Sequence, residues 1–113
     1  MTAADIRRIA MALPRTRDGI VRDSVRYYIG RIVYVALSPD ETIMGFAYPK
    51  EGRASLVASQ PAKFRLPRQS DLRYNWVDVV LDAIDEDEAI ALIEDAWTMV
   101  VPKSVAAQYF RSE

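Results

Sequence analysis

The sequence predicts an α+β domain in which helices pack on one antiparallel sheet. Three observations support this class. Apolar residues recur at helical spacing near both ends, short runs that resemble strands lie between them, and glycine or proline separates many of these runs. The chain of 113 residues suits one domain, spanning 1–113, and is too short for two. We expect the order α-β-β-β-α-β-β-α.

The first half supplies a helix and three strands. Thr2 and Asp5 resemble a capping box, and apolar residues at helical spacing follow as far as Leu13, before Pro14 ends the helix. Residues 14–23 are predicted to be a charged loop. Strands are expected at 25–29, 31–37 and 42–48, with Gly30 in the first turn and a proline turn in the second.

The second half begins with a short helix over 50–59 and a hairpin formed by 63–67 and 74–83. Asp85 and Glu88 have the spacing of a helix start, and the helix that follows is expected to end before Pro102. Trp97 falls on its apolar stripe and is predicted to lie in the core. Residues 104–110 can add one or two last helical turns.

One strand raises the question of what covers the sheet. The run Ile32 to Leu37 is apolar on both faces, whereas a strand with one wet face should alternate. Helices, buried edges and loops, or a second subunit could cover that face, and we expect a homodimer.

Histidine and cysteine are both absent. Their absence excludes a Ser-His-Asp triad, thiol catalysis and the usual zinc sites. No serine has the setting of a known nucleophile motif. We therefore expect a protein that is not an enzyme and that has no cofactor and no metal. The chain also lacks an apolar run long enough to cross a membrane, so a cytoplasmic location is expected.

Charge is distributed unevenly along the chain. Residues 1–74 hold 13 basic against 7 acidic residues, and residues 75–113 hold 2 against 9. The candidate phosphate contacts are first Arg65, Arg68 and Arg73, near the second hairpin, and then Arg15 and Arg17. The alternative is that these are solvated loop charges, since the sequence pI is about 5.5.

The acidic run and the tryptophans have simpler explanations than a site. Asp82 and the four acids over 85–88 lie at a helix start, where capping and the helix dipole account for them better than a metal does. Trp76 lies on the opposite side of its strand from Val77 and Val79, so it can pack under a helix or reach a cleft.

Several stretches together resemble the MmcQ/YjbR family of small bacterial proteins. They are A-L-P at 12–14, Y-Y-I-G-R-I-V-Y-V-A-L at 27–37, V-A-S-Q-P at 57–61 through Phe64, W-V-D-V-V-L-D at 76–82, A-W at 96–97 and V-P-K at 101–103. The resemblance implies a helix, three strands, a helix, two strands and a helix, arranged as in secretion chaperones. It also implies DNA binding, because the fold looks like a double-wing DNA-binding domain.

The hypothesis from the sequence is therefore a small cytoplasmic binding protein that contacts DNA through arginines. Two alternatives stay open. One is a dimeric module that binds another protein and has no nucleic-acid role, and the other is a binder of a small ligand.

Overall fold

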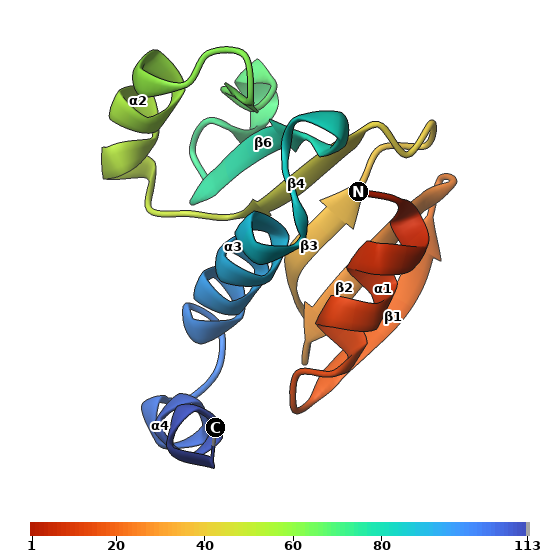
Figure 1. Cartoon of the computed structure of the whole chain (residues 1–113), viewed down its shortest axis with the longest axis vertical. Coiled ribbons are helices and arrows are strands. Elements are labelled where there is room, and N and C mark those ends of the chain that lie inside the picture. Colours follow the sequence, from red (N-terminus) through yellow and green to blue (C-terminus); the bar gives the residue numbers. More distant parts are fainter. Residues whose placement is uncertain (113) are drawn as a thin grey trace.

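A six-stranded antiparallel sheet forms the frame of the protein, and helices pack on it (Figure 1). The computed structural model describes residues 1–112 and confirms the α+β class. The strands pair in the order β1-β2-β3-β4-β6-β5. They span Thr16–Val21 (β1), Ser24–Ile29 (β2), Ile32–Leu37 (β3), Ile43–Ala47 (β4), Phe64–Arg65 (β5) and Trp76–Val80 (β6). The helices span Ala3–Met11 (α1), Lys50–Ser59 (α2), Glu86–Thr98 (α3) and Lys103–Ser112 (α4), with short 3-10 turns at Gln69–Asp71 (η1) and Leu81–Ala83 (η2).

Residues 14–23, predicted to be a loop, contain strand β1 instead. β1 pairs with β2 from Thr16 opposite Ile29 to Val21 opposite Ser24. Its side chains do not alternate between polar and apolar, because β1 is an edge strand and most of them are exposed. The two-residue turn that follows has no glycine or asparagine, although both of its residues have positive φ. The sequence therefore lacks the usual signals of this hairpin.

Helices α1 and α3 lie on the same face of the sheet (Figure 1). The stripe residues of α3, including Ile93, are buried, as are Val77 and Val79 of β6. The predicted caps are present: the Thr2 hydroxyl accepts a hydrogen bond from the Asp5 amide, and the Asp85 carboxylate accepts one from the Glu88 amide. The core thus lies between these two helices and one side of the sheet.

A β-bulge explains part of the unusual apolar pattern of β3. Tyr27 pairs with Val35 and Tyr28 pairs with Val33, so Tyr34 is skipped in the register. Tyr34 and Val35 are both completely buried, and the Tyr34 hydroxyl lies 2.7 Å from the Thr16 hydroxyl. The bulge places two consecutive side chains in the core, and it accounts for them without a second subunit. Ile32, by contrast, is exposed.

Trp97 lies in the core, as predicted. Its indole Nε1 donates a hydrogen bond of 3.0 Å to the Pro14 carbonyl, and its ring packs edge-on against Tyr109 of α4. α4 is a helix of 10 residues, longer than the one or two turns expected. None of the helices in residues 1–112 combines the length and apolar character that crossing a bilayer requires.

Candidate functional site: the open face of the sheet

The strand register defines a second face of the sheet, which points away from α1 and α3. One row of side chains crosses it through Gly19, Arg26, Ala36, Gly45, Asp78 and Arg65, each opposite the next on a neighbouring strand. We call this surface the open face; its members are Arg17, Gly19, Arg26, Tyr28, Val33, Ala36, Ile43, Gly45, Ala47, Arg65, Trp76, Asp78 and Val80. Most are half-buried or exposed, whereas Val77 and Val79, their neighbours on the helix side, are fully buried. Solvent therefore reaches most of this face.

Two aromatic rings lie down on the open face against glycine backbones. A Cβ atom added to Gly45 would lie 2.5 Å from the Nε1 atom of Trp76, and one added to Gly19 would lie 3.1 Å from Cε2 of Tyr28. Both glycines are therefore positions where the ring takes the space of a side chain. From the sequence, Trp76 could either pack under a helix or reach a cleft. In the structure it lies half-buried on this face.

Three arginines share the face with these rings. The Arg17 guanidinium lies 4.2 Å from the centroid of the Tyr28 ring and donates hydrogen bonds to the Gly30 carbonyl. Arg65 lies directly opposite Asp78, on β5. Arg26 is half-buried, and its Nε is buried without a hydrogen-bond partner within residues 1–112. Because a buried donor without a partner is costly, Arg26 is the most unusual of the three.

Asp78 is the acidic member of the open face. Burial is the main cause that raises the pKa of this carboxyl to about 6, and the negative charge of Asp71 raises it further. The positive charges of Arg68 and Arg65 act in the opposite direction, but no neighbour in the described part of the chain donates a hydrogen bond to the carboxylate. The carboxylate is therefore partly desolvated, and its oxygens can accept hydrogen bonds from a bound molecule.

The arginines predicted from the sequence separate into two groups. Arg15 and Arg17 lie at or next to β1, and Arg65, Arg68 and Arg73 lie in and after β5. β1 and β5 are opposite edges of the sheet, five strand spacings or about 24 Å apart. The structure therefore does not bring the two sets into one patch.

Of the five predicted arginines, two project onto the open face, Arg17 and Arg65. Arg68 is 81% exposed and lies 3.4 Å from the Asp71 carboxylate, and the Arg73 guanidinium lies 4.8 Å from the Tyr74 ring centroid. Sequence reasoning did not single out Asp78 as a site residue, and it did not include Arg26 among its five candidate phosphate contacts. The sequence did contain one signal that could have indicated Asp78, namely a charged residue between the two core valines Val77 and Val79.

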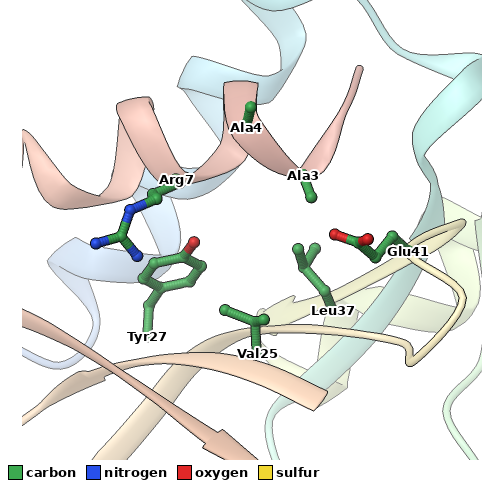
Figure 2. A pocket seen from close by; sticks show the side chains of 7 residues that line it. All are labelled: Ala3, Ala4, Arg7, Val25, Tyr27, Leu37 and Glu41. Carbon is green, nitrogen blue, oxygen red and sulfur yellow. The ribbon is translucent and has the colours of Figure 1, made fainter. Parts of the chain in front are cut away.

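Two small pockets lie elsewhere. The first, about 200 Å³, lies between α1 and strands β2 and β3; in Figure 2 the Tyr27 hydroxyl points toward Arg7 and the Glu41 carboxylate lies near Leu37. The Arg7 guanidinium is already paired with Asp18 at 2.5 Å. The second, about 240 Å³, lies between the end of β4 and α3. Both are smaller than the roughly 300 Å³ at which ligand pockets usually begin.

The acids at the start of α3 have local partners in the structure. Asp85 caps the helix, Glu86 is paired with Arg8 of α1, and residues 1–112 contain no cluster of three carboxylates that could hold an ion. Glu88 is instead paired with Lys63 at 2.7 Å.

The fold and the open face define a class: small α+β proteins in which helices cover one side of an antiparallel sheet. The YjbR family model matches residues 11–99, so the chain belongs to the YjbR family and the predicted resemblance is confirmed. The crystal structure of Deinococcus radiodurans protein DR2400, which carries the family-model domain DUF419, is similar in fold. The TM-score is 0.76 and the identity 17%, over 91% of this chain and 80% of that one. No curated protein matched.

Proposed function

We propose that the protein binds single-stranded nucleic acid across the open face. The observation that supports this most strongly is that three arginines and two aromatic rings share one face of the sheet: Arg17, Arg26, Arg65, Tyr28 and Trp76. Proteins that bind single strands combine basic side chains along the backbone with aromatic rings on which bases stack. A flat sheet face with both elements provides such a surface.

The width of the face favours a single strand over a duplex. The six strands span about 24 Å, whereas the major groove of B-DNA is about 12 Å wide and admits a helix or a two-stranded ribbon. The open face is therefore too broad to enter a groove. A flexible single strand, by contrast, can lie across it and expose its bases to Trp76 and Tyr28.

Local charge supports the same partner. The open face carries three arginines and one aspartate, although the whole chain has a formal net charge of −1. Phosphates would therefore be attracted at short range, and the attraction should weaken as salt screens it. A slightly acidic protein of this kind is expected to bind weakly at physiological ionic strength.

Fluorescence anisotropy with labelled single-stranded and duplex DNA tests the proposal, at salt concentrations of about 50 and 200 mM. The test variant carries Arg17→Glu and Arg65→Glu. Its matched control carries Lys103→Glu and Arg111→Glu, which make the same charge change on exposed residues of α4. We expect the single strand to bind more tightly than the duplex.

The open-face variant should lose about tenfold or more in affinity and show a shallower salt dependence, while the control changes little. An equal loss in both variants would mean that net charge alone matters, and it would overturn the assignment of the site.

A homodimer formed through the open face is the rival function. Val33, Ala36, Ile43 and Val80 are half-buried there, and a second copy could complete their burial. Light scattering after size exclusion distinguishes the two. A stable dimer at micromolar concentration that binds no strand even at low salt would replace nucleic-acid binding with protein association.

A further inference from the structure

We propose that Asp78 recognises a guanine base of the bound strand, with that base stacked on Trp76 and a neighbouring phosphate held by Arg26. The inference rests on the proposed single-strand binding and adds which base the open face selects.

Trp76 and Asp78 lie close enough to contact the same base, Trp76 by stacking and Asp78 by accepting hydrogen bonds. They are two residues apart on β6, so both side chains project from the same face, about 7 Å apart along the strand. The Trp76 ring leans over Gly45, which lies directly opposite Asp78 on β4. A base stacked on this ring therefore has its edge within reach of the carboxylate.

The chemistry of the carboxylate selects guanine among the bases. An ionised carboxylate only accepts hydrogen bonds and has two oxygens to do so. The Watson–Crick edge of guanine carries two adjacent donors, the ring N1–H and the N2 amino group. None of the corresponding edges of adenine, cytosine and thymine carries two adjacent donors. Because no group in residues 1–112 donates a hydrogen bond to Asp78, both of its oxygens are available.

Arg26 supplies the second contact. It lies in the same row as Asp78, three strand spacings or about 14 Å away. The two residues between them in the row are Ala36 and Gly45, and the Trp76 ring on which the base would stack occupies the space over Gly45. The buried Nε of Arg26 has no hydrogen-bond partner in its present position. If the guanidinium turns toward a phosphate, it gains a charge-assisted hydrogen bond.

The test uses thymidine oligonucleotides of about 12 nucleotides, a length in the range that small single-strand binding domains cover. One oligonucleotide has a single central guanine, a second has hypoxanthine, which lacks the N2 amino group, and a third has thymidine throughout. Affinities are measured by anisotropy at about pH 8, where an aspartate with a raised pKa is still ionised. The guanine oligonucleotide should bind on the order of tenfold more tightly than the hypoxanthine one.

Asp78→Asn should abolish this preference and leave binding to the thymidine oligonucleotide within about twofold, because stacking and phosphate contacts remain. Asp82→Asn, at an exposed aspartate just after β6, is the matched control and should keep the preference.

The outcomes separate the two claims. If the guanine and hypoxanthine oligonucleotides bind with equal affinity, Asp78 does not recognise guanine, and the proposal of single-strand binding still stands. Equal weakening of every oligonucleotide by Asp78→Asn assigns Asp78 a structural role and also overturns the inference. If no oligonucleotide binds at low salt, both claims fail. The guanine–hypoxanthine comparison uses the unaltered protein, so it decides the question even if a variant folds poorly.

Discussion

Replacing Asp78 by asparagine should stabilise the protein at neutral and alkaline pH and leave its stability in acid nearly unchanged. The pKa of Asp78 in the folded protein is raised from its ordinary value of 3.8 to about 6, mainly by burial. A carboxyl with a raised folded pKa binds its proton more tightly in the native state than in the unfolded chain. The free energy of unfolding therefore falls as pH rises through this range.

The size of the effect follows from the pKa difference. Each pKa unit corresponds to about 1.4 kcal/mol, so the rise corresponds to at most about 3 kcal/mol. Because the side chain is only half-buried, solvent screening reduces this to about 1.5 kcal/mol. The full difference should be present above about pH 7 and should disappear below about pH 3, where both states are protonated.

Urea unfolding followed by tryptophan fluorescence measures this difference across the pH range. Subtracting the Asp78→Asn curve from that of the unaltered protein cancels the other carboxyls, such as Asp18, whose pKa is lowered by the Arg7 guanidinium. Asp82→Asn again serves as the exposed control. A variant that is less stable than the parent protein at about pH 8 would refute the reasoning, because it would show that the ionised carboxylate has a stabilising partner.

Three further substitutions test the fold. Arg22→Asn combined with Asp23→Gly should raise the free energy of unfolding by about 1 kcal/mol, because these residues suit the φ values of 51° and 65° in the β1–β2 turn; the urea midpoint reports it. Gly45→Ala should cost about 1–3 kcal/mol and shift the near-UV circular dichroism of Trp76, since the new methyl group meets the indole; an unchanged spectrum would contradict the placement of the ring. Trp97→Phe should cost about 3 kcal/mol in the same unfolding assay through lost volume and a lost hydrogen bond, and a loss below about 1 kcal/mol would mean that Trp97 is not in the core.

The sequence predicts best those parts of the fold that local chemistry determines. The caps at Thr2 and Asp85 depend on side chains three residues from their targets, and the alternation of β6 depends on neighbours along one strand. Both can be read from short windows. Strand β1 cannot, because its partner β2 determines it and its turn uses Arg22 and Asp23 at an unusual conformation.

The candidate site was less predictable, because the order of the strands in space creates it. Charge along the chain grouped Arg65 with Arg68 and Arg73, which are close in sequence. The sheet instead places Arg65 on one face with Arg26 and Asp78, from strands far apart in the chain. Only the pairing of β4 with β6 brings these residues into one row, and that pairing depends on long-range contacts that no local pattern encodes.

The two indole N–H signals in an NMR titration test single-strand binding on the open face most directly. The chain has two tryptophans: Trp76 lies on the open face, and Trp97 is fully buried and hydrogen-bonded to Pro14. Addition of a guanine-containing single strand should shift the Trp76 indole signal and the amide signals of Arg26, Gly45 and Asp78, while the Trp97 signal stays in place. A strand that binds and shifts signals of α1 and α3, but leaves the Trp76 indole unmoved, would contradict the account.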